Sequence, residues 1–399
     1  MTFPAESPSP TGATSGEVIV HVFGRTDVGR TREHNEDSFI VIDLTTDNAS
    51  LQPDVRTHVA GPRGTLFMVA DGLGGAAAGE IASDLAVTTV YEELRARWIH
   101  GADSEAASFA AALKGAAEAS NTRIFTHALE HPENRGLGTT ATIAGLLGDT
   151  LYVAQVGDSR AYLIRDGVAR QITKDQSLMQ RLIEAGELTP DEAERSERRN
   201  IILQALGPEP TVKIDLTYQH LRRGDTLVLC TDGLSGLVKK EEIAEVVSEF
   251  DDLVDVCREL IDRANENGGP DNITVIAARF EGTGLLDAAP DDYVGHAVFP
   301  MAGADITPPQ GKPRLEGALS ALPTPVSGER VDDPAGDGAG LTDNGGPARG
   351  SRAWLLVLAG IVLLAALLLA TRQWGSASKA APHGAAPHDT ASGEMTTAP

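Results

Sequence analysis

Apolar and polar positions alternate with two different periods between residues 16 and 281, which predicts short strands and longer helices. The strand patterns are rich in β-branched residues, and the helix patterns place apolar residues three and four positions apart. Strands are predicted at 18–23, 38–42, 65–70, 139–147, 150–156, 161–165, 226–230 and 272–280. Helices are predicted at 79–97, 104–130 and 253–267, with a charged, helix-prone insertion between residues 175 and 200.

Turn signals decide how these strands are connected. Gly148-Asp149 and Asp166-Gly167 lie between consecutive strand patterns, and such pairs suit hairpins better than crossovers. In the insertion, Thr189 can cap a helix that begins at Pro190. Strands in runs and helices in pairs predict an α+β domain over residues 16–281, with antiparallel sheets covered by helices.

Composition changes on both sides of this domain. Residues 1–15 are rich in Pro, Ser, Thr and Gly and are expected to be disordered, as is a Pro- and Gly-rich linker at 282–352. Residues 353–370 form an unbroken apolar run of about 27 Å as a helix, close to the thickness of a membrane core. A buried core helix is the weaker alternative, because a flexible linker separates the run from any core. We therefore predict one transmembrane helix, followed by a short disordered tail at 371–399.

The charges beside the apolar run do not fix its orientation. Arg349 and Arg352 precede it, and Arg372 and Lys379 follow it. The amino terminus lacks the basic start and apolar run of a secretory signal. We therefore expect a single-pass protein of the inner (plasma) membrane with its folded domain in the cytoplasm.

The charge balance limits the partners of the domain. The chain carries 33 Lys and Arg against 57 Asp and Glu, a formal net charge of -24, which argues against nucleic acid as a ligand. Any anionic substrate must therefore meet local positive charge. Cys230 and Cys257 are the only two cysteines, and both fall in apolar patterns, which suits core packing in a reducing compartment.

Acidic residues recur where strand patterns end or begin. Asp71 and Asp232 each follow an apolar strand in an Asp-Gly-Leu-x-Gly context, and Asp271 precedes the last strand. Glu36 and Asp37 precede another strand. If these strands are antiparallel neighbours, their ends and starts share one edge of a sheet, so the carboxylates would converge.

Converging carboxylates repel one another unless a cation neutralises them. Hard divalent ions such as Mg²⁺ and Mn²⁺ prefer such oxygen ligands, and no Cys or His cluster with zinc spacing competes. Without a Cβ at Gly72, a backbone carbonyl could approach an ion, while Gly74 and Gly75 permit a tight turn.

An ordinary Asp-Gly turn is the alternative interpretation of each acid. It is the better interpretation for Asp149, Asp166 and Asp225. For Asp71 and Asp232 the repeated context makes an ion site and a turn about equally probable on spacing alone.

Eight motifs in order give residues 16–281 a resemblance to a known family, the metal-dependent protein phosphatases (PPM, type 2C serine/threonine phosphatases). The motifs are Gly29-x-x-Arg32-x-x-Asn35-Glu36-Asp37-Ser38, Ala70-Asp71-Gly72-Leu73-Gly74-Gly75 with Gly79-Glu80, Gly138-Thr139-Thr140, Gly157-Asp158-Ser159-Arg160, Ile172-Thr173-Lys174-Asp175, residues 200–207, Asp232-Gly233-Leu234-Ser235 and Gly269-Pro270-Asp271-Asn272. The chain most resembles a bacterial, membrane-anchored form.

This resemblance implies two packed antiparallel sheets flanked by helices, with two Mn²⁺ or Mg²⁺ ions at one edge. It implies that Asp71 bridges the ions and that the Gly72 carbonyl binds one of them. Asp232 and Asp271 would complete the other ion, and Glu36 and Asp37 would hold metal-bound waters or support the site. Arg32 would bind the phosphate.

The implied activity is hydrolysis of phosphoserine and phosphothreonine in proteins by a metal-activated water. Phosphorylated proteins would be the partners, including serine/threonine kinases and their substrates. A catalytically inactive phosphatase-like module at the membrane is the alternative. It is disfavoured because Asp71, Asp232 and Asp271 are all present. A structural membrane scaffold would leave the ordered motifs unexplained.

Four features depart from the family pattern or extend it. Leu73 stands where some relatives have a histidine proposed as general acid, and Gln176 replaces a histidine that often follows the Asp175 position. Glu133 is the nearest acid for a third ion, whose presence stays open. Residues 178–200 resemble the family's flap, which neighbours the site.

Overall fold

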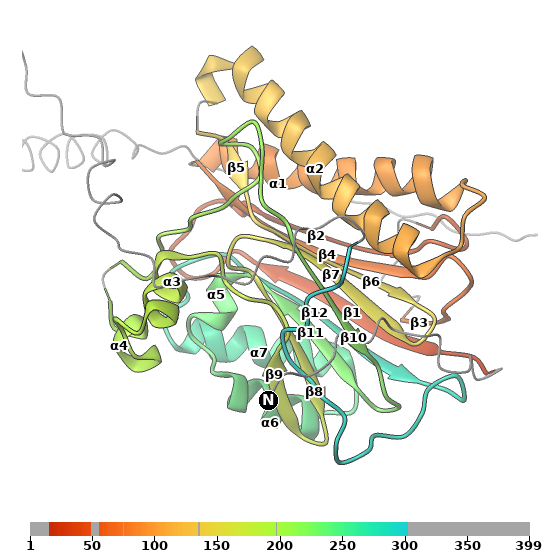
Figure 1. Ribbon diagram of the computed structural model, residues 1–399. Coiled ribbons are helices and arrows are strands. Elements are labelled where there is room, and N and C mark those ends of the chain that lie inside the picture. Colours follow the sequence, from red (N-terminus) through yellow and green to blue (C-terminus); the bar gives the residue numbers. More distant parts are fainter. Residues whose placement is uncertain (1–15, 49–55, 75, 135, 197, 302–399) are drawn as a thin grey trace, which may run out of the picture. The chain divides into compact units, whose positions relative to one another are not determined.

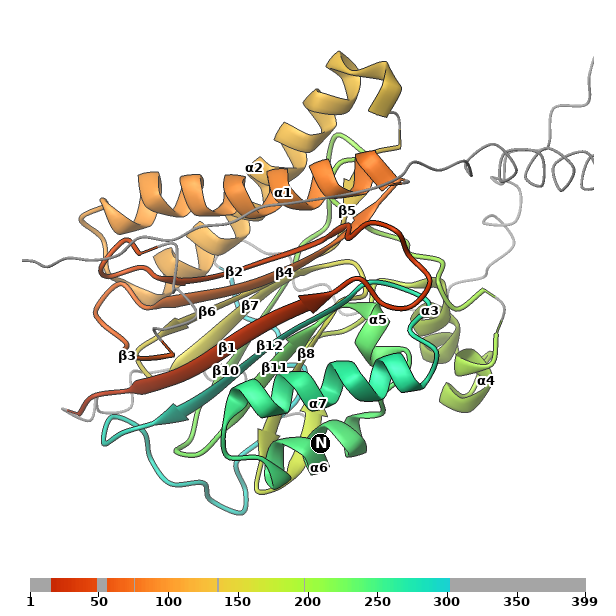
Figure 2. The same ribbon diagram turned by 180° about the vertical axis from the view of Figure 1, so that it is seen from behind.

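A computed structural model describes residues 16–48, 56–74, 76–134, 136–196 and 198–301. Within this part of the chain two antiparallel sheets pack face to face, and helices cover both outer faces (Figures 1 and 2). The predicted architecture of two packed sheets with flanking helices is thus confirmed. Gly75 and Arg135 lie outside the described residues. So do the expected disordered amino terminus, transmembrane helix and tail, and most of the expected linker.

The first sheet holds both ends of the domain. Its strand order is β3-β1-β12-β11-β8-β9, and every pairing is antiparallel. The strands are β1 (Ile19–Asp27), β3 (Thr57–Val59), β8 (Arg160–Arg165), β9 (Val168–Gln171), β11 (Thr226–Cys230) and β12 (Ile273–Glu281).

The second sheet has the order β10-β7-β6-β4-β2, and the short β5 pairs with the end of β4. Its strands are β2 (Asp37–Asp43), β4 (Thr65–Leu73), β5 (Gly138–Thr139), β6 (Ala141–Leu147), β7 (Thr150–Val156) and β10 (Asp215–His220). The single strand predicted at 139–147 is therefore two strands that are separated at Thr140.

Helices form the two outer layers and the insertion. The helices are α1 (Ala76–Leu94), which continues as the π-helix η1 (Arg95–Ile99), α2 (Ala106–Glu130), the 3₁₀ turn η2 (Pro132–Asn134), α3 (Leu178–Ala185), α4 (Pro190–Glu194), α5 (Asp232–Ser235), α6 (Lys240–Glu249) and α7 (Leu253–Glu266). The predicted cap at Thr189 is present, because its hydroxyl accepts from the Glu192 N–H and the Glu192 carboxylate bonds back to Thr189. Among the described helices, none is both long and apolar enough to cross a membrane.

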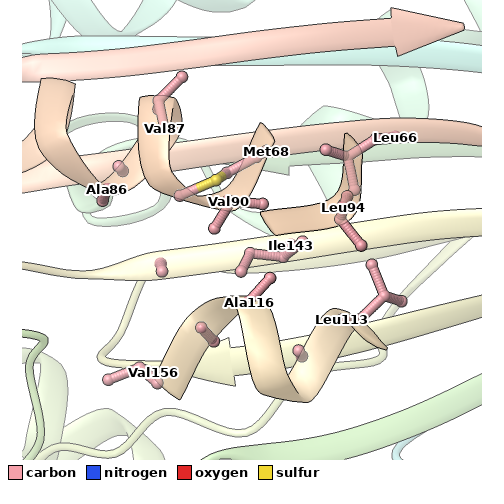
Figure 3. Packing of buried hydrophobic residues seen from close by; sticks show 14 of the residues in the cluster. Leu66, Met68, Ala86, Val87, Val90, Leu94, Leu113, Ala116, Ile143 and Val156 are labelled. Carbon is pink, nitrogen blue, oxygen red and sulfur yellow. The ribbon is translucent and has the colours of Figure 1, made fainter. Parts of the chain in front are cut away.

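The period of two along β4 explains why this strand is apolar on both faces. Leu66 and Met68 point toward α1 and α2, where they pack with Val90 (Figure 3). Phe67 and Val69 point the other way, into the core between the two sheets. A third core lies between the first sheet and the helices α6 and α7. Each large side chain buried in this way contributes about 1.5–3 kcal/mol relative to exposure.

Residues 282–301, which we call the C-terminal strap, differ from the predicted linker. Leu285 is buried in the core between the sheets, and Phe299 is buried against Tyr152 and Tyr218. Backbone hydrogen bonds of 3.0 Å from the Tyr218 N–H to the Ala297 carbonyl and 2.8 Å from the Phe299 N–H to the Leu216 carbonyl attach the strap to the edge of β10. The strap thus covers an edge strand that would otherwise be unpaired.

Candidate metal centre

Neighbouring strands of the second sheet place two acids side by side. Asp37 is the first residue of β2 and Asp71 lies near the end of β4, and the two are direct partners in the antiparallel register. Because the side chains of directly opposed residues emerge on the same face of a sheet, both carboxyl groups lie on one side at its edge. The predicted convergence of Asp71 with Asp37 is therefore present in the structure.

The first sheet contributes two more acids at the same edge. Its strand β11 ends at Cys230, which pairs with Val275 of β12. Asp232 opens the short helix α5 directly after β11, and Asp271 lies two residues before β12 begins. The end of one strand and the start of the next thus meet, as the sequence predicts, on the side of the molecule where α5 lies (Figure 2).

Electrostatic interactions show that these acids form one cluster. Burial, followed by repulsion from Asp37, Asp232, Asp158 and Asp271, raises the pKa of Asp71 well above its usual value. Burial, with repulsion from Asp232 and Asp271, raises the pKa of Asp37 to about 7. Ionised carboxylates at these positions would destabilise the fold unless a cation balanced them.

Asp71 and Asp232 are neighbours in this cluster. Burial, followed by repulsion from Asp271, raises the pKa of Asp232 overall, although interaction with the Asp71 carboxyl group lowers it. A proton on one of two neighbouring carboxyl groups would reduce their repulsion. A divalent cation could replace such a proton and interact with both groups.

Glu36 and Arg32 complete the edge on the loop between β1 and β2. Arg32 Nη2 lies 2.9 Å from Asp271 Oδ2, and the side chain is 46% exposed, so it faces both the cluster and solvent. The backbone N–H of Glu36 donates to Asn272 Oδ1 at 2.8 Å, which attaches this loop to the start of β12. Burial raises the pKa of Glu36, and Arg32 opposes this effect.

Close backbone contacts explain the glycines of this region better than the predicted approach of an ion alone. A Cβ at Gly72 would lie 2.3 Å from the Gly79 carbonyl oxygen and 2.5 Å from that of Glu36. A Cβ at Gly79 would lie 2.1 Å from Glu36 Oε2. Glycine at 72 therefore lets β4, the β1–β2 loop and α1 meet here, because its close neighbours are backbone atoms, whereas the contact at 79 is with the end of a side chain. Gly74 has φ +117°, which supports the predicted turn.

Asp158 belongs to the cluster although the sequence reasoning did not assign it to the site. Its Oδ1 is buried and has no hydrogen-bond partner. Burial, followed by repulsion from Asp232 and Asp175, raises the pKa of Asp158 to about 7. The signal that could have identified it is the one used for Asp71, since Asp158 also follows an apolar strand, β7, after a glycine.

Glu133, the acid considered for a third ion, lies elsewhere. It is exposed on η2, and its Oε1 lies 3.1 Å from Nδ1 of His131. Asp158, and not Glu133, is the additional acid that repels Asp71.

Leu73 and Gln176, the two positions that depart from the family pattern, differ in what their side chains contact. Leu73 ends β4 opposite Gly138 and offers no proton. The Gln176 side chain accepts from the Gly157 N–H at 3.0 Å and donates to the Lys213 carbonyl at 3.2 Å. Gln176 therefore ties the start of the insertion to the turn that carries Asp158.

The acids interpreted as ordinary turn residues occupy turns or hydrogen-bond to residues close in sequence. Asp149 accepts from the Thr150 hydroxyl, and Asp166 occupies a turn with φ 50°. Asp225 closes a turn by accepting from the Arg222 N–H, and it also forms a buried ion pair with Arg165 at 2.7 Å.

The donor chemistry of the cluster fits a hard divalent cation, although the side chains do not yet surround one. Within the described ranges, no three His, Cys, Asp or Glu side chains enclose a point where an ion could sit. The acids nevertheless lie close enough together to raise one another's pKa, and a cation would relieve this repulsion. Oxygen donors and no nearby thiolate or imidazole set match Mg²⁺ or Mn²⁺.

Comparisons with known proteins relate the chain to protein phosphatases. A family model described as protein phosphatase 2C matches residues 46–273. The serine/threonine phosphatase stp of Listeria innocua is 35% identical over 257 residues, which cover 64% of this chain and 94% of that protein. The serine/threonine protein phosphatase PstP of Mycobacterium tuberculosis is 36% identical over 263 residues, 65% of this chain but only 45% of that protein.

Solved structures show the same fold. The crystal structure of the Mycobacterium tuberculosis phosphatase PstP/Ppp has a TM-score of 0.56 and 34% identity, and the match covers 66% of this chain and 99% of that one. The catalytic domain of PstP in complex with 2 manganese ions has a TM-score of 0.53 and 33% identity, with 66% and 99% coverage. The acids at the junction of the two sheets and the extent of these matches together show that the chain belongs to the protein phosphatase 2C family of serine/threonine phosphatases.

Proposed function

We propose that this chain removes phosphate from phosphoserine and phosphothreonine in proteins with the help of two Mn²⁺ or Mg²⁺ ions at the acid cluster. The observation that carries the proposal is the convergence of acids at one edge of the sheets: Asp71 lies directly opposite Asp37 in the strand register, and Asp232, Asp158 and Asp271 lie close enough to raise the pKa of Asp71. A bound cation would stabilise these buried carboxylates, whereas without one their burial and repulsion destabilise the fold. Groups with such raised pKa values are therefore candidates for a functional site.

Several oxygen atoms are available to hold the two ions. Asp71 lies between acids of both sheets, which suits a bridging role, and the Gly72 carbonyl follows it directly. Asp232 and Asp271 would serve one ion from the first sheet, while Glu36 and Asp37 would support the site from the β1–β2 loop. The manganese complex of the related PstP catalytic domain supports two ions as the number.

When bound, the ions would lower the pKa of a water molecule and supply positive charge beside the phosphate. Arg32 supplies the protein's own cation, because its guanidinium is half exposed beside Asp271 and can donate two parallel hydrogen bonds to phosphate oxygens. This local positive charge matters because the whole chain carries a net charge of -24. Arg32 thus binds and orients an anionic substrate at the edge of the cluster.

The cysteines do not offer a competing route through a covalent intermediate. Both Cys230 and Cys257 are fully buried, and burial raises the pKa of each thiol to about 12. A neutral, inaccessible thiol is a poor nucleophile. A cysteine nucleophile is therefore excluded, and the route that we propose is attack by water.

The substrates are proposed as a class. Phosphorylated proteins are the substrate class, and serine/threonine kinases and their targets are the proposed partners. The alternative function, from a different class, is that of a catalytically inactive phosphatase-like module. The complete acid cluster and the exposed Arg32 beside it favour the enzyme.

We also propose that residues 353–370 anchor the chain in the plasma membrane as a single transmembrane helix, with the phosphatase domain, residues 16–301, on the cytoplasmic side. The support is the unbroken apolar sequence between Arg352 and Arg372, which matches the thickness of a membrane core.

Replacing Asp71 with Asn tests the assignment of the cluster. The amide keeps the shape but removes the charge that would bridge two cations, so we expect kcat/KM for a phosphothreonine peptide to fall at least about 100-fold, with a matching loss of Mn²⁺ affinity. The matched control is Asp166→Asn in an exposed Asp-Gly turn, which should leave both unchanged. Near-normal activity of folded Asp71→Asn protein would refute the assignment.

Metal removal should reveal the repulsion inside the cluster. Folding raises the pKa values of Asp37 and Asp158 from about 4 to about 7 and also raises those of Asp71 and Asp232. The folded state therefore holds more protons than the unfolded state between about pH 4 and 7, and its stability is lost as pH rises through this range. His58, whose pKa burial lowers, acts in the opposite sense but is a single group.

We expect the free energy of unfolding of the chelator-treated protein to fall by about 1.4 kcal/mol per pH unit for each excess proton. Urea unfolding between pH 5 and 7.5 measures this slope, and added Mn²⁺ should restore stability most at the higher pH. Metal-free protein that becomes more stable over this range would show that the acids do not repel one another.

Membrane anchoring is tested by charging the centre of the apolar run. Each Arg at the centre of a transmembrane helix costs about 2.5–3.5 kcal/mol on insertion scales, so Leu358→Arg with Leu364→Arg should move the protein from the membrane pellet to the supernatant. Gly338→Arg with Gly340→Arg, in the expected linker, is the control that should stay in the pellet. An unchanged chain that already remains in the supernatant would exclude the anchor.

A further inference from the structure

Asp37 is the point where side chains of the two sheets meet at the acid cluster. It begins β2 in the second sheet, but its Oδ2 accepts hydrogen bonds from two hydroxyls of the first sheet, Thr231 at 2.9 Å and Thr274 at 2.7 Å. Both threonines are completely buried. Thr231 immediately precedes Asp232, and Thr274 lies three residues after Asp271. The partners of Asp37 are therefore attached to the two strands that carry the other acids.

The direction of the first hydrogen bond is fixed by the backbone. The Thr274 N–H donates to Thr231 Oγ1 at 3.0 Å, and the Thr231 N–H donates to the Thr274 carbonyl at 3.1 Å. An ionised carboxylate only accepts, and the Thr231 hydroxyl, whose oxygen accepts from the backbone, has one proton to donate. The Thr231 proton is therefore directed at Asp37.

A chain of donors fixes the second hydrogen bond in the same sense. Asn35 Nδ2 donates to Thr26 Oγ1 at 2.8 Å, and Thr26 Oγ1 lies 2.7 Å from Thr274 Oγ1. Because Thr274 gives its proton to Asp37, Thr26 must donate to Thr274. The chain closes on itself, since the Asp37 N–H donates to Asn35 Oδ1 at 3.1 Å.

This closed network leaves one carboxylate oxygen of Asp37 free. Both hydroxyls that donate to the Asp37 carboxylate, those of Thr231 and Thr274, end at Oδ2, and no hydrogen bond from the described part of the chain reaches Oδ1. Groups that hydrogen-bond to a metal-binding side chain, without touching the ion themselves, fix the orientation of that side chain and strengthen ion binding. Loss of such a partner typically weakens ion binding even though the partner never touches the ion.

We propose that Thr231 and Thr274 are positioning residues, whose hydroxyls hold Oδ2 of Asp37 so that Oδ1 faces the ions. This inference rests on the proposed phosphatase function and adds two residues to it. It also gives the contact between the sheets a role, because a shift of β11 or β12 would turn Asp37 away while moving Asp232 and Asp271. The ion site would then depend on the relative position of the two sheets.

Paired substitutions separate the hydroxyl from the shape of each threonine. Valine keeps the branched shape and removes the donor, whereas serine keeps the donor and removes the methyl group. Thr226→Val is the matched control, since Thr226 is equally buried but lies at the opposite end of β11, opposite Arg279. Circular dichroism verifies that each variant of the full-length chain is folded.

Isothermal titration of the full-length chains, in mild detergent, with MnCl₂ alone measures the effect. We expect Thr231→Val and Thr274→Val to raise the Kd for Mn²⁺ about 10- to 100-fold. Thr231→Ser, Thr274→Ser and Thr226→Val should bind close to the unchanged chain. Hydrolysis of p-nitrophenyl phosphate should show the same pattern as a higher Mn²⁺ requirement, with kcat recovering when Mn²⁺ is saturating.

Three results would overturn the inference. Folded valine variants that bind Mn²⁺ as tightly as the unchanged chain would show that the hydroxyls do not position Asp37. Equal losses in the serine and valine variants would assign the effect to packing of the methyl groups. An unchanged chain that neither binds Mn²⁺ nor hydrolyses the ester would contradict the proposed function itself, and this inference with it.

Discussion

Repulsion among buried carboxyl groups is the interaction on which the site of this protein depends. Asp71, Asp37, Asp232 and Asp158 lie where water is largely excluded, and burial together with their mutual repulsion raises the pKa of each. In isolation such a cluster opposes folding at neutral pH. A divalent cation reverses the sign of the interaction, because each carboxylate then gains more from the ion than it loses to its neighbours. The same charges that destabilise the metal-free fold would bind the ions that perform the chemistry.

The fold holds these groups together through backbone geometry. Antiparallel register places Asp37 directly opposite Asp71, and the pairing of Cys230 with Val275 brings the end of β11 to the start of β12. Glycine is needed at 72 because a Cβ there would lie 2.3 Å from a carbonyl oxygen of α1. Since these constraints act on the backbone, the acids cannot move apart without disrupting the strand ends themselves. The threonine network around Asp37 extends this constraint across both sheets.

The strand ends, and with them Asp71, Asp232 and Asp271, could be predicted because apolar strands of this kind have clear boundaries. Asp158 also follows a strand, but its Gly-Asp context equals that of an ordinary turn, so its sequence signal is weaker than that of Asp71. In the structure, burial of its unpaired oxygen distinguishes it from a turn residue. The strap at 282–301 has the Pro, Gly and Asp composition of a linker. Its attachment relies on two apolar anchors, Leu285 and Phe299, and on backbone hydrogen bonds that leave no pattern in the sequence. Strand β10 and helix α6 were missed because their sequences are largely polar.

The most direct test of the central claim is anomalous diffraction from crystals of the protein grown with Mn²⁺. The account requires two manganese peaks at the junction of the sheets, one on each side of the Asp71 carboxylate, with oxygens of Asp232 and Asp271 at coordination distance of one of them. Manganese bound only at other places, with none at the Asp71 and Asp232 carboxyl groups at neutral pH, would contradict it.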